Sequence, residues 1–250
     1  MSQYLFSFLF ILFSLEYVDS YSQSTDHQLD KFFKRKMEKA NIAGLQVGYL
    51  KEGELKWVGS YGLMDYSTGT KVNDSTLFMI ASCSKPVTAL GVMKLYDQGL
   101  IDLDDDINHY LPFKISNPHF PKETITVRML LTHTSSLQDD MDLLESLYTL
   151  DEGGDSPIEL EDFIREYFKQ GGKYYSHKNF TKTPPGKGKV YSNTGYALAG
   201  YLIQRITDNS FSEYMREEIF KPLDMKNSNW FLKEISHQNI SLPHEPIDNQ

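Results

Sequence analysis

The apolar residues near the start of the chain first recur at helical spacing and then alternate with polar ones. Between residues 27 and 40 the apolar positions are three to four apart, which predicts an amphipathic helix. They are Leu29, Phe32, Phe33, Met37 and Ala40. Leu45, Val47 and Tyr49 alternate with other residues, and after a turn with a glycine at 51–54 so do Leu55, Trp57 and Tyr61. This second pattern predicts a β-hairpin.

Two later stretches are apolar around most of a helix. The first follows Ser82, contains Val87, Leu90, Val92, Met93 and Leu95, and ends at Gly99. A helix that is apolar all round packs inside a core, so we expect a buried helix here. Residues 196–206 predict a second core helix, and Ser210–Glu213 is a capping box that starts the next one.

Composition limits the classes of partner. The 250 residues suffice for one sizeable domain, with no repeat or low-complexity linker. A net charge of −9 argues against nucleic acid or an anionic membrane surface as a partner. The single cysteine, Cys83, excludes an internal disulfide, and we interpret it as a small packed side chain rather than a redox group.

The N-terminal segment has features of a secretory signal. The apolar run Tyr4–Leu15 is too short to span a bilayer comfortably, and Val18 and Ser20 are small enough for cleavage after Ser20. No Lys or Arg precedes the run, so an uncleaved membrane anchor is the alternative to a signal peptide at residues 1–20. Sequons are compatible with a secretory route, at Asn73, Asn179 and Asn239. We expect a secreted protein or one in the lumen of the secretory pathway.

Candidate chemistry begins with Ser82 and Lys85, an S-x-x-K pair. Residues three apart share a helix face, so the Lys85 amine can reach the Ser82 oxygen. Serine becomes a good nucleophile when a nearby group accepts its proton, and desolvation or a helix N-terminus can hold a lysine neutral. Alone, the pair is short enough to arise by chance, as a helix cap followed by a solvated lysine. Its place before an apolar helix favours catalysis.

The second candidate motif is Tyr191-Ser192-Asn193, which follows a turn rich in proline and glycine at 184–188. Alternate residues of an extended segment point the same way, so Tyr191 and Asn193 offer a phenol for proton transfer and an amide for orienting a substrate or the lysine. The alternative is a turn in which the tyrosine packs and the asparagine bonds to backbone.

Together these motifs resemble the serine β-lactamase and penicillin-binding-protein superfamily, specifically its class C-like branch, in which Y-x-N replaces S-D-N. The resemblance covers about residues 27–232 and includes four further segments. They are Phe78–Ala81, similar to a lead-in strand; Leu95–Asp105, similar to a helix exit; Leu130–Leu137, with Ser136 where glycine is expected; and Ile219–Met225.

The resemblance implies an α+β fold of the β-lactamase/transpeptidase type. In it, an antiparallel sheet with flanking helices packs against a helical subdomain, with the active site between them. It also implies two-step acyl transfer: Ser82 attacks an ester, amide or lactam carbonyl, and Asn193 positions Lys85 and the substrate. Lys85 and Tyr191 manage the proton, and which of them is the base stays open. The implied partner is a small molecule or peptide with a scissile acyl group, and no metal or organic cofactor is needed. A membrane becomes a partner only if the N-terminal segment is uncleaved.

Family members carry a third motif, K-T-G or H-x-G, on a later strand that supplies an oxyanion-hole amide. Nothing in 225–250 fits that motif, and only the first hairpin of the expected sheet is present. We therefore interpret residues 21–250 as a serine hydrolase domain that is truncated before the third motif, and favour a fragment of a longer chain. The alternative is a catalytically inactive or truncated relative that acts as a binding or interaction protein.

The segment 138–183 contains acidic residues that could suggest a metal site: Asp139, Asp140, Asp142, Glu145, Asp151 and Glu152. The histidine and glycine spacing of a metal loop is missing, so we expect a solvated acidic loop. His133, in the segment 130–137, is expected to be structural rather than a base.

Overall fold

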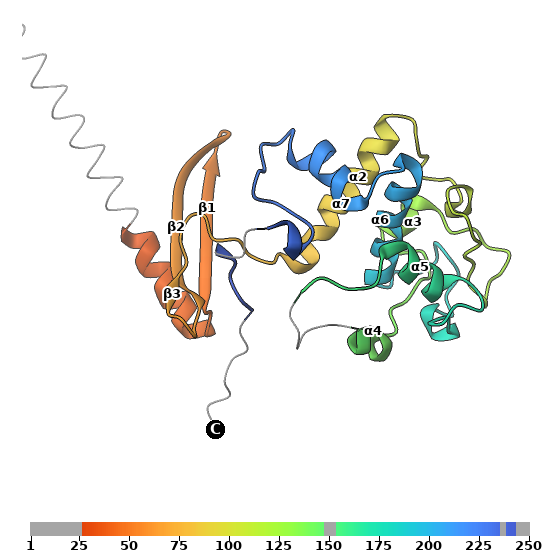
Figure 1. Cartoon of the computed structure of the whole chain (residues 1–250), viewed down its shortest axis with the longest axis horizontal. Coiled ribbons are helices and arrows are strands. Elements are labelled where there is room, and N and C mark those ends of the chain that lie inside the picture. The colour runs from red at the N-terminus through yellow and green to blue at the C-terminus, as the bar shows by residue number, and fades with distance from the viewer. Residues whose placement is uncertain (1–26, 148–153, 236–238, 244–250) are drawn as a thin grey trace, which may run out of the picture. The chain divides into compact units, whose positions relative to one another are not determined.

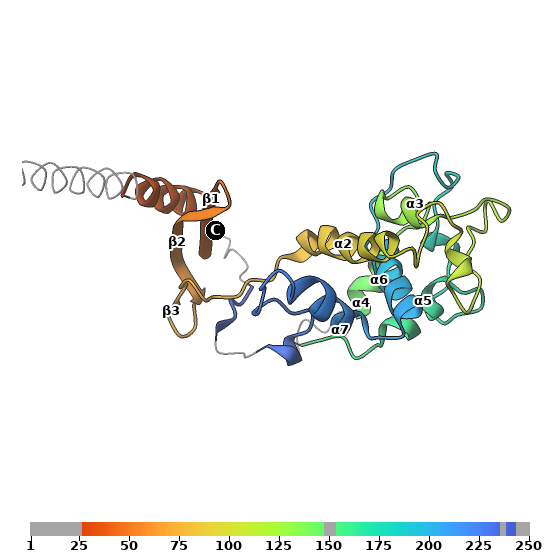
Figure 2. The same cartoon turned by 90° about the horizontal axis from the view of Figure 1, so that it is seen from above.

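The computed structural model describes residues 27–147, 154–235 and 239–243, which fall into two compact units (Figures 1 and 2). Unit 1 contains residues 27–79 and 239–243, and unit 2 contains residues 80–235 apart from the gap. The segment 1–20, with its predicted signal peptide or anchor, lies outside the described residues. Among the helices of the described part, none is long and apolar enough to cross a bilayer.

Unit 1 confirms the predicted helix and hairpin. Residues 27–40 are helical, and β1 (Gly44–Lys51), β2 (Glu54–Asp65) and β3 (Thr70–Lys71) form an antiparallel sheet in that order. The β1–β2 register runs from Gly44 opposite Gly62 to Lys51 opposite Glu54. Glu52 and Gly53 both have positive φ, as a tight hairpin turn requires. The helix packs on the sheet through Phe33, whose ring stacks on Trp57 at 5.6 Å.

The expected lead-in strand at Phe78–Ala81 is wrong. Pairing ends at Leu77, which forms an isolated parallel bridge with Ile240 inside unit 1. Met79 and Ile80 are exposed and belong to no strand, and Ala81 has a φ of 44°. A left-handed residue cannot continue an extended strand, so the chain turns there instead.

Unit 2 is helical, and α6 (Asn193–Thr207) lies at its centre. Around it are α2 (Ser84–Asp97), α3 (Val127–Leu131), α5 (Leu160–Phe168) and α7 (Phe211–Met215), each in contact with α6 (Figure 1). The other elements are α4 (Met141–Leu147), 3-10 turns at Ala81–Cys83, Ile107–His109, His177–Asn179 and Leu232–Glu234, and a π-helical turn at Arg216–Phe220.

The prediction of a core helix at 196–206 is confirmed: Leu198, Leu202 and Ile203 are fully buried. The capping box before α7 is confirmed at its N-cap, where the Ser210 hydroxyl accepts the Glu213 backbone N–H. With helices and a small antiparallel sheet, the fold is α+β.

Helix α2 is buried on one side only, so the expectation of a helix buried all round is wrong. Val92 and Leu95 are fully buried, but Leu90, Met93 and Tyr96 are 39–46% exposed. Within unit 2 the helix contacts α6, α7 and the π-helical turn. At Gly91 this contact is so close that a Cβ would lie 2.7 Å from Met215 Sδ.

The three sequons differ in accessibility. Asn179 is fully buried, and its Nδ2 donates to the carbonyl oxygens of Tyr167 and Tyr174. A glycan cannot be attached to this side chain in the folded unit. Asn73 is exposed and Asn239 is half-buried.

Candidate active site

The first site segment is the turn that leads into α2. Ser82 lies in the 3-10 turn Ala81–Cys83, not in α2 itself, and the turn and helix together keep Ser82 and Lys85 on one face. Ala81, directly before Ser82, is a non-glycine residue at φ 44°, a conformation that costs roughly 1–2 kcal/mol. Ser82 is exposed and Lys85 is half-buried. The interpretation of Cys83 as a packed side chain is wrong, because Cys83 is exposed on the same turn. The turn therefore presents the Ser82 hydroxyl to solvent at the start of a helix.

The structure brings Ser82, Lys85 and Tyr191 together. Tyr191 OH donates a hydrogen bond to Ser82 Oγ at 2.7 Å, and Lys85 Nζ lies 3.2 Å from the same oxygen. Lys85 Nζ also lies 4.7 Å from the centre of the Tyr191 ring. Both groups that could take the serine proton are therefore within hydrogen-bonding reach of Ser82 Oγ.

Asn193 joins this group from the start of α6. Its Oδ1 accepts a hydrogen bond from Lys85 Nζ at 2.7 Å. Ser192, between Tyr191 and Asn193, is the N-cap of α6, and its Oγ accepts the backbone N–H of Gly195 at 2.9 Å. The helix start thus fixes the backbone that carries the Y-x-N motif, and all four predicted site residues meet in unit 2.

Electrostatics favour the ionised form of the phenol. A hydrogen-bonding contact with Lys85, and then the bond with Ser82, lower the pKa of Tyr191 below its ordinary value. Tyr191 is 51% exposed, so solvent screens part of this effect.

His133 contacts the Y-x-N segment through a hydrogen bond and a ring contact. Its Nδ1 accepts the backbone N–H of Ser192 at 3.1 Å, and its ring centre lies 4.5 Å from that of Tyr191 and 5.0 Å from that of Tyr196. Burial, and then the charges of Lys85 and Lys189, lower the pKa of His133. These are contacts of a neutral, structural histidine that holds Tyr191 in place.

The expectation of a solvated acidic loop is wrong for Asp139. Its carboxylate accepts hydrogen bonds from Ser192, Asn193 and Thr194 at the start of α6. Asp142 and Glu145 are exposed as expected, and Asp151 and Glu152 lie outside the described residues. Within the described ranges, no group of three or more metal-ligating side chains is found. Sequence reasoning missed Asp139 because its partners are more than fifty positions away.

Ser136 stands where the resemblance expects glycine, and the backbone explains the expectation. Its φ is 63°, in the left-handed region that glycine adopts most easily. The serine hydroxyl is used here: Ser136 Oγ accepts a hydrogen bond from the fully buried Asn117 at 3.0 Å. The departure from glycine is thus accommodated without loss of the turn.

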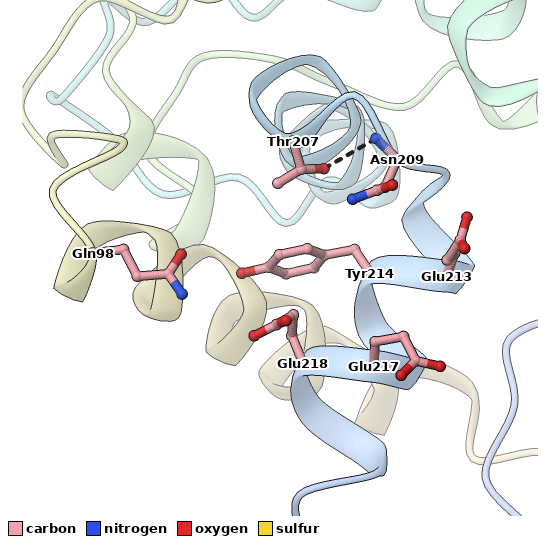
Figure 3. A pocket seen from close by; sticks show the side chains of 7 residues that line it. All are labelled: Gln98, Thr207, Asn209, Glu213, Tyr214, Glu217 and Glu218. Carbon is pink, nitrogen blue, oxygen red and sulfur yellow. Dashed lines mark hydrogen bonds between the residues drawn. The ribbon is translucent and has the colours of Figure 1, made fainter.

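A separate cavity lies at the other end of α2 (Figure 3). It is lined by Gln98, Thr207, Asn209, Glu213, Tyr214, Glu217 and Glu218. Its acidic side chains form ion pairs, including Glu218 with Lys94 at 2.7 Å and Glu217 with Lys221 at 2.8 Å. The cavity contains none of the predicted site residues, so it is not part of the candidate active site.

Comparison with known proteins places the chain in a family. A family model described as Beta-lactamase matches residues 29–240. Protein flp of Staphylococcus aureus (strain N315) is 28% identical over 209 residues, which are 84% of this chain and 39% of that protein. Penicillin-binding protein 4* of Bacillus subtilis (strain 168) is 27% identical over 188 residues, 75% of this chain and 38% of that protein. The chain thus spans about two fifths of the length of these relatives.

Solved structures agree on the fold. The octameric penicillin-binding protein homologue from Pyrococcus abyssi superposes with a TM-score of 0.69 at 25% identity, covering 86% of this chain and 47% of that one. The match of the family model extends over well more than half of the chain. The chain therefore belongs to the β-lactamase family and has the β-lactamase/transpeptidase fold.

Proposed function

We propose that the protein is a serine hydrolase that forms an acyl-enzyme on Ser82. One observation carries the proposal: Ser82 Oγ lies within hydrogen-bonding distance of both Tyr191 OH and Lys85 Nζ. A serine held between a phenol and an amine has a path for its proton, which is the condition for nucleophilic attack.

The proposed reaction has two steps. Ser82 Oγ bonds to the carbonyl carbon of the substrate while its proton passes to the neutral amine of Lys85 or the phenolate of Tyr191. The bond to the leaving group breaks, and the leaving group takes a proton from the same pair. Water then attacks the acyl-enzyme, its proton returns through the pair, and the acid and free Ser82 are released. The two groups act as a coupled unit, so a single base need not be assigned.

Asn193 would hold the amine at its working position. Its Oδ1 accepts from Lys85 at 2.7 Å, close to Ser82, so the amine cannot swing out to solvent without breaking a bond. This restraint favours a near-attack geometry over the many positions open to a free lysine side chain.

The substrate class we propose is an ester, amide or lactam with an accessible acyl group, and the branch is the class C-like one. Two of the similar proteins are called penicillin-binding, and penicillin is a lactam. The Y-x-N motif, rather than S-D-N, supports the branch. Exposure of Ser82 and Tyr191 is compatible with substrates larger than a single ring.

The test is covalent labelling of the folded protein with a fluorophosphonate probe and with a fluorescent penicillin. We expect a single adduct that maps to Ser82 by peptide mass spectrometry and disappears in Ser82→Ala. Ser146→Ala, which removes an exposed serine of α4, is the matched control and should label normally. Labelling of Ser82→Ala at the wild-type rate would contradict the proposal. A cooperatively folded protein that neither probe labels would favour the alternative of a binding or interaction protein.

We also propose that the protein enters the secretory pathway. The apolar run Tyr4–Leu15 and the exposed sequon at Asn73 support this proposal. In a secretory host, the glycan at Asn73, removable by peptide N-glycosidase, should be lost in Asn73→Gln, whereas Asn179→Gln should leave glycosylation unchanged because Asn179 is buried. A cytosolic, unglycosylated product would contradict it.

A further inference from the structure

We propose that Asp139 is a positioning residue of the active site: its carboxylate orients the Asn193 amide so that the amide oxygen faces Lys85. The inference rests on the proposed function, because the orientation matters for catalysis only if Lys85 serves Ser82. It assigns a role to a residue outside the two sequence motifs.

The carboxylate accepts five hydrogen bonds from three consecutive residues. Asp139 Oδ2 accepts from the backbone N and the side-chain Nδ2 of Asn193, both at 2.8 Å. Oδ1 accepts from Thr194 N at 2.9 Å, Thr194 Oγ1 at 2.7 Å and Ser192 Oγ at 3.0 Å. Asp139 is therefore bound to every residue of the turn into α6 from Ser192 to Thr194.

One of these bonds determines which way the Asn193 side chain faces. A side-chain amide has a donor end and an acceptor end. With Nδ2 donating to Asp139, Oδ1 is left to accept from Lys85 at 2.7 Å. In the reversed orientation Oδ1 would face the Asp139 carboxylate, which is repulsive, and Lys85 Nζ would lose the acceptor for its hydrogen bond. A carboxylate at 139 thus selects one orientation.

Capping of α6 does not account for this role. The Ser192 hydroxyl already accepts the Gly195 N–H as the N-cap. Backbone N–H groups at a helix start also favour a negative charge, which explains how a half-buried carboxylate is tolerated there. Neither effect requires a bond to the Asn193 side chain, and that bond is the one that reaches the site.

The test compares Asp139→Asn with Asp140→Asn. Both remove one negative charge at adjacent positions, but the Asp140 carboxylate accepts no hydrogen bond from the described residues. In Asp139→Asn an amide opposes the Asn193 Nδ2, so the reversed orientation is no longer excluded. We expect the rate of Ser82 acylation to fall about 10- to 100-fold, the cost of a lost hydrogen bond to a charged group. The alkaline and acid limbs of the pH–rate profile should also move. Asp140→Asn should stay within about twofold of wild type, and equal rates in the two variants would overturn the proposal.

A double-mutant cycle separates positioning from a general effect on the fold. If Asp139 acts through Asn193, then Asp139→Asn adds little to Asn193→Ala, and the double variant acylates about as slowly as Asn193→Ala alone. Thr194→Val also removes a hydrogen bond to Asp139 but leaves the Asn193 amide untouched. It should lower stability without moving the pH–rate profile. Additive losses in the cycle would overturn the proposal.

A third readout does not depend on activity. In protein labelled with ¹⁵N-lysine, the Nζ signal of Lys85, assigned with Lys85→Arg, should shift in Asp139→Asn and stay in place in Asp140→Asn. This measurement tests the role of Asp139 even if Ser82 is unreactive. In that case the proposed function is contradicted, but the proposed role of Asp139 is not. If Asp139→Asn does not fold, Asp139→Glu keeps the charge and displaces the carboxylate. It should shift the same signal, and an unchanged Lys85 signal in a folded Asp139 variant would refute the inference.

Discussion

The two helix starts that meet at the candidate site are built in opposite ways. The turn into α2 has exposed residues from Ala81 to Cys83, a left-handed residue at Ala81, and no side-chain cap from the described residues. The turn into α6 has a buried cap at Ser192, a carboxylate at Asp139 that accepts five hydrogen bonds, and a histidine beneath it.

The comparison shows that the attacking serine and the residues that determine its surroundings lie on different turns. Ser82, the attacking group, lies on the turn with few constraints, where solvent and substrate have access. Tyr191, which shares the serine proton with Lys85, and Asn193, which holds Lys85, come from the turn whose polar atoms are satisfied. A site of this kind keeps its reactive atoms accessible and has its geometry determined by a well-packed neighbour. Four predictions test this comparison.

The largest expected effect is on chemistry at the α2 start. Lys85→Ala should lower the rate of Ser82 acylation about 10²- to 10⁴-fold, the usual contribution of a positioned acid or base. The free energy of unfolding should change by about 1 kcal/mol or less, because a cation at a helix N-terminus is not stabilising. Stopped-flow acylation by an activated ester and urea unfolding measure the two quantities.

Lys94→Ala is the matched control on the same helix. It removes an ion pair with Glu218, far along α2 from Ser82, and should leave the acylation rate unchanged. A Lys85→Ala variant that acylates at the wild-type rate would remove the α2 start from the chemistry.

The next effect is on stability at the α6 start. Ser192→Ala deletes the N-cap and a hydrogen bond to Asp139 from a side chain that is 1% exposed, and should cost about 2 kcal/mol of unfolding free energy. Ser210→Ala deletes the N-cap of α7 alone and should cost about 1 kcal/mol. Urea titrations measure both, and equal losses would show that the α6 start is an ordinary cap.

A smaller effect is expected at Ala81. Ala81→Gly relieves the strain of a left-handed alanine but also increases the conformational entropy of the unfolded chain. Because the two effects oppose each other, the free energy of unfolding should rise by only about 0.5 kcal/mol. The rate of Ser82 acylation should fall severalfold, because the turn then samples other conformations. Asp208→Gly, at the left-handed C-cap of α6, should leave the rate unchanged. An acylation rate in Ala81→Gly equal to wild type would mean that the strain has no role in the site.

The smallest effect is the pH dependence that His133 contributes. Its pKa is lowered in the folded protein relative to about 6.5 in the unfolded chain, so the unfolded chain binds the proton first. The stabilisation is present above pH 6.5 and is lost as pH falls through the lower, folded value. Asparagine tolerates the positive φ of 59° at this position, so His133→Asn should fold. In this variant the free energy of unfolding should vary less with pH below pH 6.5. Urea unfolding midpoints between pH 7.5 and 5 measure this pH dependence. If the midpoints of wild type and His133→Asn change in parallel, the pH dependence does not come from His133.

The sequence by itself determined the local parts of this protein. The helix at 27–40, the hairpin, the core helix α6 and the capping box at Ser210 follow from periodicity and turn residues, because they depend on hydrogen bonds between near neighbours. The pairing of Ser82 with Lys85 follows for the same reason. The meeting of the S-x-x-K and Y-x-N motifs was anticipated by resemblance to a family, not by spacing.

Only the tertiary structure decided which distant residues support the site and which surfaces are covered. Asp139 is 54 positions from Asn193, and His133 is 59 from Ser192, so no local pattern links them. In the sequence, Asp139 and Asp140 look like part of a solvated loop. Only the fold shows that the start of α6 lies against Asp139. Likewise, the apolar sequence of α2 does not say that Leu90 and Met93 stay exposed, nor that pairing stops at Leu77. Burial and strand pairing depend on which segments the folded chain brings alongside, and that is a property of the whole fold.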